Sequence, residues 1–287
     1  EIYMGDWSSD VCSSDLVSPI IAPTLGGYIT ALFGWRYVFL ALIIIVLFIL
    51  AGAYFFLPES KQPNPDFSLK PTPIIRNFLS IIKHPHFNTF ALTGAISYAG
   101  LYGYVGGSPY VFMEIYQVSE STFGWIFAFV AMGLIGASQV NNLALKRYTS
   151  EQIIKTASFC QAIIGIMLVS FTFFGWTNLF LTVLFVFIFL SCQGFIFPNA
   201  TALALAPLAH NAGNASALIG AIQMGIGAAA AAVVSIFHDH TALPMSVVMT
   251  SCSIMAFTIF YFGRKMIVRR ADREQLQQEN VEMISKL

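Results

Sequence analysis

The hydrophobic positions of this chain are gathered into long stretches that carry almost no charged residues. An α-helix needs about 20 such residues to cross the hydrocarbon core of a bilayer, and several stretches reach that length. Polar, proline-rich or glycine-rich segments separate them, so the pattern predicts membrane-spanning helices joined by loops. We expect eight spans, at residues 17–32, 37–57, 90–113, 123–145, 153–174, 179–205, 215–237 and 245–262.

Composition agrees with this pattern. Hydrophobic residues make up 57% of the 287 residues and charged residues only 10%, whereas soluble domains average about 25% charged residues. The fold class is therefore an all-α integral membrane protein with the lipid bilayer as its surroundings. A formal net charge of zero argues against a nucleic-acid partner.

The basic residues indicate how the spans are oriented. All 14 Lys and Arg residues except Arg36 fall in the segment 58–87, around the loop at 146–155, or in the tail from residue 264. Loops rich in Lys and Arg stay on the cytoplasmic side of a membrane. We therefore predict a cytoplasmic linker at 58–87, with a short surface helix at 74–83, and a helix-prone cytoplasmic tail at 264–287.

Residues 1–16 differ from everything that follows. They are acidic, contain no Lys or Arg, and repeat a Ser-Ser-Asp sequence. A signal peptide has a positive start and an apolar middle, and this segment has neither. We interpret it as a non-native, artefactual leader, with a genuine acidic leader as the alternative.

A motif of proline and glycine residues runs from the first span to the start of the second. Its residues are Pro19, Pro23, Gly26, Gly27, Gly34, Trp35 and Arg36. Proline and glycine are tolerated in membrane helices where neighbouring helices pack closely. The P-x-x-GG and GWR elements resemble the antiporter motif in the fifth span of drug:proton antiporters of the major facilitator superfamily. They are most similar to the bicyclomycin-resistance (Bcr/CflA) branch of multidrug efflux proteins.

This resemblance extends to later stretches, including FPNATALAL at 197–205 and AGNASALIGAIQ at 212–223. It implies a partial facilitator bundle made of family spans five to twelve, with an N-terminal truncation before span five. Residues 17–57 would be the last two helices of the N-terminal bundle, and 88–263 the complete C-terminal six-helix bundle. It further implies a monomer in the bacterial inner membrane that exchanges protons for small amphipathic substrates, without a cofactor.

Polar and aromatic residues inside the predicted spans are the candidates for a substrate cavity. They are Tyr98, Tyr102, Gln193, Asn199, Gln223 and Met224. Tyr98 and Tyr102 are four residues apart and therefore share a helix face. Aromatic rings with a few amides suit a pocket for amphipathic compounds. The alternative for each residue is helix packing or hydrogen bonding between helices.

Proton coupling usually requires an ionisable residue inside the membrane. The six spans from residue 90 onward contain no Asp, Glu, Lys or Arg in their middles. Glu114 is the nearest candidate, but it lies at the extracytoplasmic end of its span. The resemblance places the coupling acid in the N-terminal half of the family, so the coupling residue is unknown here.

Small residues form a second pattern. Gly133, Gly136, Ala221, Gly225 and Gly227 lie in spans and predict faces for close helix contact.

The sequence contains no motif that is typical of an enzyme or of a metal site. The His238-Asp239-His240 cluster lacks a fourth ligand and is typical of a solvated turn, so we expect no metal site. No glycine-rich phosphate loop or Ser-His-Asp set is present, which argues against an enzyme.

Three functions remain open. Proton-coupled efflux of small amphipathic compounds is the first, a facilitator for a sugar or other metabolite is the second, and a non-transporting membrane scaffold or receptor is the third.

The orientation leads to a labelling prediction. In a variant whose native cysteines are replaced, Pro65→Cys should react with a membrane-impermeant maleimide only after the cells are opened, because segment 58–87 is placed in the cytoplasm. Labelling of this residue in intact cells would overturn the orientation.

Overall fold

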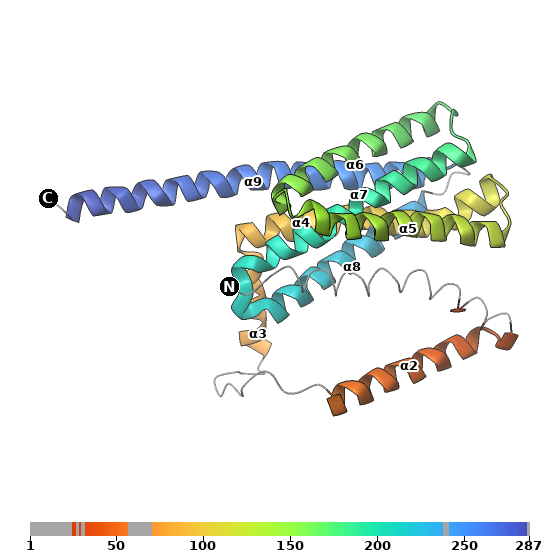
Figure 1. The fold of residues 1–287 in the computed structure, drawn as a ribbon, viewed down its shortest axis with the longest axis horizontal. Helices are drawn as coiled ribbons and strands as arrows, with labels where there is room; N and C mark the ends of the chain where they lie inside the picture. Colours follow the sequence, from red (N-terminus) through yellow and green to blue (C-terminus); the bar gives the residue numbers. More distant parts are fainter. Residues whose placement is uncertain (1–24, 27–28, 30–31, 57–70, 238–240, 286–287) are drawn as a thin grey trace.

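The computed structural model describes residues 25–26, 29, 32–56, 71–237 and 241–285, and the part it describes is built from helices (Figure 1). The α-helices are α2 (Trp35–Phe56), α3 (Pro71–Ile82), α4 (Pro85–Pro109), α5 (Glu120–Ala144), α6 (Ser150–Phe173), α7 (Leu179–Leu205), α8 (Ala212–Ile236) and α9 (Leu243–Ser285). A π-helical turn, Tyr110–Ile115, follows α4, and a 3-10 turn, Ala206–Asn211, joins α7 to α8. The predicted all-α fold is confirmed.

The predicted spans from residue 37 onward correspond to α2 and to α4 through α9. Six of the described helices are long and apolar enough to cross a membrane, and α4 is not one of them. It carries many Gly, Ser, Thr and Tyr residues, yet most of its residues are buried. A spanning helix enclosed by other helices does not meet lipid, so it can be less apolar. The first predicted span lies mostly outside the described residues.

Helices α4 to α9 form one bundle (Figure 1). It consists of two interleaved triplets of consecutive helices, α4 to α6 and α7 to α9. The first helix of each triplet packs between the second and third helices of the other. Thus α4 packs against α8 and α9, α7 packs against α5 and α6, and α4 also contacts α7. Because consecutive helices alternate in direction, α4 and α7 run antiparallel, as in transporters built from inverted repeats.

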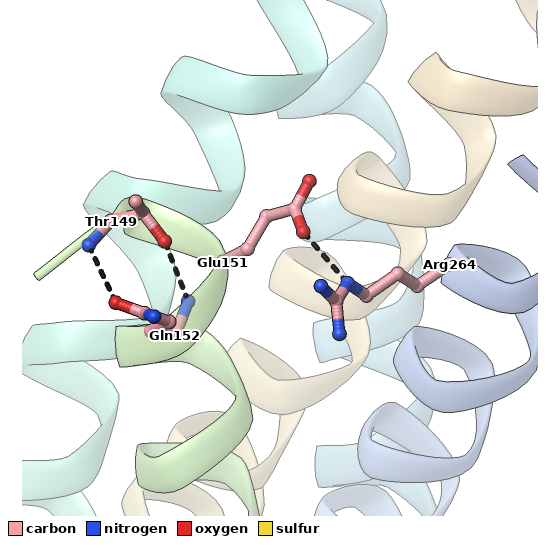
Figure 2. A network of polar contacts seen from close by, with 4 residues as sticks. All are labelled: Thr149, Glu151, Gln152 and Arg264. Carbon is pink, nitrogen blue, oxygen red and sulfur yellow. Dashed lines mark hydrogen bonds and ion pairs between the residues drawn. The ribbon is translucent and has the colours of Figure 1, made fainter. Parts of the chain in front are cut away.

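A capping motif in the sequence marks the start of helix α6. Thr149 accepts from the backbone N–H of Gln152 while the Gln152 side chain accepts from the backbone of Thr149, a capping box that starts α6 (Figure 2). Such a pair satisfies backbone donors that a helix leaves unpaired. Glu151, which lies between these two residues, accepts a hydrogen bond from Arg264 of α9 at 2.7 Å. This ion pair joins the start of α6 to α9.

Helix α2 begins in the gap between the first two predicted spans. Gly34 has φ of +93°, a conformation that favours glycine, and α2 starts at Trp35. The Arg36 guanidinium lies 4.7 Å from the centre of the Trp35 ring. No residue of α2 is buried, and an added Cβ on Gly26 would meet nothing within 4 Å. Pro19, Pro23, Gly27 and the leader 1–16 lie outside the described residues, as does the 238–240 cluster.

The other helical segments expected from the sequence are present. The surface helix predicted at 74–83 corresponds to α3, and the tail continues α9 as one helix to Ser285. In Figure 1 the second half of α9 extends beyond the bundle.

Glycine allows the closest approaches between helices. An added Cβ on Gly194 of α7 would occupy the space of the Leu134 carbonyl oxygen and lie 3.0 Å from the Ala137 Cβ, both in α5. Gly133 likewise meets Phe187 and Ser191. The close helix contact predicted for the small residues therefore occurs at Gly133, whereas an added Cβ on Gly136 or Gly225 would meet open space.

This difference gives a stability prediction. Gly194→Ala should lower the melting temperature of the purified protein, because separating α5 from α7 costs roughly 1–3 kcal/mol of overpacking. Gly136→Ala, with nothing within 4 Å of the added methyl group, is the matched control and should stay near the parent. Equal melting temperatures for the two variants would contradict the close approach at Gly194.

Candidate substrate-binding face

Four side chains from three helices meet on one face of the bundle. The rings of Tyr98 and Tyr102, both of α4, have centroids 5.8 Å apart, and Tyr98 lies 4.8 Å from the Phe197 ring of α7. The Tyr102 hydroxyl donates to the Met224 sulfur of α8 at 3.2 Å. Met224 is 56% exposed, and the three aromatic residues are half-buried. We call Tyr98, Tyr102, Phe197 and Met224 the aromatic face.

A glycine on α8 makes room for this arrangement. The Tyr102 ring lies across Gly227, so closely that an added Cβ would collide with its ring carbons. Gln223, one residue before Met224, is buried at 7% exposure. Tyr98 and Tyr102 therefore lie on one face of α4, as their spacing predicts, and Gly227 leaves room for the Tyr102 ring.

A polar network lies behind the aromatic face, near the middle of three helices. Ser97 of α4, Gln161 of α6 and Gln193 of α7 are each at most 1% exposed. The Ser97 hydroxyl donates to the Gln161 side-chain oxygen at 2.8 Å, and the Gln161 amide donates to the Phe189 carbonyl at 3.3 Å. With its own proton given to Gln161, Ser97 accepts from the Gln193 amide nitrogen at 2.5 Å. The Gln193 oxygen then accepts from the Tyr98 backbone N–H at 3.2 Å.

A second amide pair lies one to two turns further along α7. Asn199 is 2% exposed and donates to the Asn141 side chain of α5 at 2.7 Å and to the Phe195 carbonyl at 2.8 Å. The structure therefore places Gln193 and Asn199 between helices, where they make the hydrogen bonds that were the alternative to cavity lining. Tyr98, Tyr102 and Met224 are the candidates that reach the open face.

Glu114 lies outside this arrangement. It belongs to the turn Tyr110–Ile115 beyond the end of α4, and its side chain is exposed. In the part of the chain that the structure describes, no group of three His, Cys, Asp or Glu residues is placed to hold a metal ion.

Sequence reasoning did not single out Ser97, Gln161 or Phe197. The signal available for Gln161 was the same as for Gln193, an amide in the middle of an apolar span. Ser97 gave no such signal, because a serine can satisfy itself on its own helix. Only the packing of α4 against α7 brings Phe197 to Tyr98.

Comparison with known proteins agrees with this architecture. The profile of the Major Facilitator Superfamily matches residues 13–232, which is more than half of the chain. The chain belongs to the major facilitator superfamily. It is therefore a multi-pass membrane protein of a transporter family whose members act on small substrates.

Several relatives in this superfamily carry drug-resistance names. The chain is 28% identical to the bicyclomycin resistance protein homolog of Haemophilus influenzae over 86% of its own length and 62% of the relative. It is 23% identical to multidrug resistance protein D of Escherichia coli K12, over 79% of the chain and 56% of the relative. The E. coli O9:H4 multidrug resistance protein MdtL is 26% identical, with coverages of 72% and 51%. The chain thus spans between half and two thirds of the length of these relatives.

The polar network predicts an energetic coupling between α4 and α7. In a double-mutant cycle, Ser97→Ala and Gln193→Leu should show an interaction of about 0.6 kcal/mol and at most about 1.7, the range measured for hydrogen bonds between membrane helices. The measurement is unfolding in mixed micelles by titration with SDS. Thr258 is exposed and bonds only to its own helix at Ile254, so Ser97→Ala with Thr258→Ala should be additive. Additivity in both cycles would contradict the network.

Proposed function

We propose that the protein is a component of a proton-coupled exporter of small amphipathic compounds. The aromatic face is the observation that carries the proposal. It combines three aromatic rings and a thioether, which offer apolar contacts to a substrate, with buried amides directly behind them. Substrate pockets are commonly lined in this way, by aromatic groups with a few placed polar ones. The drug-resistance names of the relatives support the same substrate class.

The inverted arrangement of α4 and α7 supports a transport mechanism. Both helices supply aromatic-face residues at their middles, and facilitators bind substrates near the membrane midplane between repeats. The exposed side of α8 consists largely of Ala and Gly, among them Ala221, Gly225 and Ala228. Small residues let a second bundle approach closely and rock against this surface.

Proton coupling requires a carboxyl group that this bundle does not supply in its interior. Between residues 71 and 270 the acidic residues are Glu114, Glu120, Glu151 and Asp239, all outside the helix middles. We place the coupling carboxyl in the portion of the relatives that precedes the fifth family span. The proposed setting is the bacterial inner membrane, with the basic end of the bundle and the α9 tail in the cytoplasm. The monomeric state stays a prediction.

A hybrid transporter tests this proposal. Residues 17–262 would replace the matching region of the H. influenzae relative, and the hybrid would be expressed in an efflux-deficient bacterium. Cells should accumulate less of a cationic dye such as ethidium, and a protonophore should abolish the difference. A hybrid that inserts normally but leaves dye accumulation unchanged, or that raises uptake of a labelled sugar instead, would refute drug efflux.

Variants of the aromatic face sharpen the test. Tyr102→Ala should slow dye export roughly two- to tenfold, because an aromatic contact contributes about 0.5–1.5 kcal/mol beyond its buried area. Tyr102→Phe keeps the ring and should export dye at nearly the parental rate. Tyr261→Ala makes the same truncation at an exposed position of α9 and should have no effect. Equal losses at Tyr102 and Tyr261 would exclude the aromatic face as the binding surface.

A further inference from the structure

Helix α3 crosses the end of the bundle at which α4 begins, and its axis is nearly perpendicular to the spanning helices (Figure 1). It is held there by two contacts. The Asn77 amide nitrogen donates to Asn211 at 3.5 Å and Asn77 accepts from the Asn211 amide at 3.1 Å. Ile81, 1% exposed, packs into the cluster formed by Phe87 and Phe90 of α4. An axis perpendicular to the spans lies in the plane of the membrane surface.

The circumference of α3 is divided into three arcs. At 100° per residue, Asn77 and Ile81 face the bundle. Ile75, Leu79 and Ile82 fall within about 60° of one another, and they are 58%, 50% and 39% exposed. Arg76, Lys83 and Ser80 follow on the remaining side and are exposed. We call the set Ile75, Leu79 and Ile82 the apolar stripe.

These arcs match the three surroundings of a helix at the membrane interface. One side meets protein, the next meets acyl chains and the last meets water. Arg76 and Lys83 stand on the edge of the polar arc next to Leu79, which is the level of the headgroup phosphates in such a geometry. Long basic side chains reach that level while their stems stay on apolar surface.

The charges at this end of the bundle favour an anionic surface. From residue 71 to 270 all nine Lys and Arg residues lie at this end, namely Arg76, Lys83, Lys146, Arg147, Lys155, Arg264, Lys265, Arg269 and Arg270. The acidic residue at the same end in this stretch is Glu151, which is paired with Arg264. Arg76 and Lys83 are therefore not neutralised by a carboxylate of this stretch.

We propose that α3 docks on anionic phospholipid: the apolar stripe enters the acyl region of the leaflet while Arg76 and Lys83 bind the headgroup phosphates. Docking fixes the level of α3, and through Asn77 and Ile81 also the level of the α4 and α8 ends, relative to the membrane surface. The proposal requires only that the bundle spans a membrane and is independent of what the protein transports.

Fluorescence quenching in reconstituted vesicles tests this docking. The purified full chain, with Cys12, Cys160, Cys192 and Cys252 replaced by serine or alanine, receives one cysteine carrying bimane at Leu79→Cys or Ser80→Cys. Two kinds of phosphatidylcholine vesicle are compared. One contains phosphatidylglycerol with a nitroxide on its acyl chain, and the other contains phosphatidylcholine with the same nitroxide. Bimane at position 79 should be quenched, and more strongly by the labelled phosphatidylglycerol. Bimane at position 80, on the polar arc, should be quenched far less.

Charge variants separate α3 from the general surface potential. Arg76→Gln with Lys83→Gln should lower the preference for phosphatidylglycerol at position 79 by about fivefold for each charge removed. Lys146→Gln with Arg147→Gln removes two charges from the α5–α6 loop and should leave that preference unchanged. Circular dichroism and gel filtration of each variant check that the fold is retained.

Three results would overturn the proposal. Absence of quenching at position 79 would mean that protein or water, not lipid, covers the apolar stripe. Equal quenching by both labelled lipids would mean that the headgroup charge is not recognised. An equal loss of preference in the two charge variants would assign the effect to the whole basic end instead of α3.

Discussion

The bundle depends on the satisfaction of polar groups where no water is available. A hydroxyl or amide left unpaired in hydrocarbon costs several kcal/mol, so Ser97, Gln161 and Gln193 are tolerated at the membrane centre only when α4, α6 and α7 meet in one register. The same register positions the residues of the aromatic face. Tyr98 follows Ser97 on α4 and donates its backbone N–H to Gln193, while Phe197 lies one turn after Gln193 on α7. The hydrogen bonds that hold the bundle together therefore also set the distance between the rings proposed to bind substrate.

Close approach between helices is the second condition, and glycine supplies it at specific places. Gly194 lets α7 lie against the α5 backbone, and Gly227 lets the Tyr102 ring cross α8. Both contacts involve a helix that contributes to the aromatic face, α7 in one case and α4 in the other. Because α4 and α7 occupy equivalent positions in the two interleaved triplets, the packing that buries them also brings their middles together.

Charge acts at the ends of the bundle instead of in its interior. The Glu151–Arg264 pair has side-chain exposures of 38% and 45%, and an ion pair that exposed contributes at most about 1 kcal/mol. Its contribution is to join α6 and α9 at the basic end, next to the capping box of Thr149. The same end carries α3, so interior hydrogen bonds set the helix register while the basic end relates the bundle to the membrane surface.

The fold class, the positions of the spans from residue 37 onward, the break between the first two spans and the shared helix face of Tyr98 and Tyr102 could all be predicted from the sequence. Each of these follows from local periodicity, hydropathy or backbone preference, which need no knowledge of neighbours. The sequence did not show which of the candidate residues reach the open face of the bundle, because Gln193, Asn199 and Met224 carry the same signal of a polar or adaptable side chain in an apolar span. Tertiary packing decided it: Gln193 and Asn199 turn to Ser97 and Asn141 on other helices, whereas Met224 remains open beside Tyr102. Packing also decided that Gly133 is enclosed while Gly136, three residues later, is open, since burial depends on which helix lies opposite and not on the residue itself.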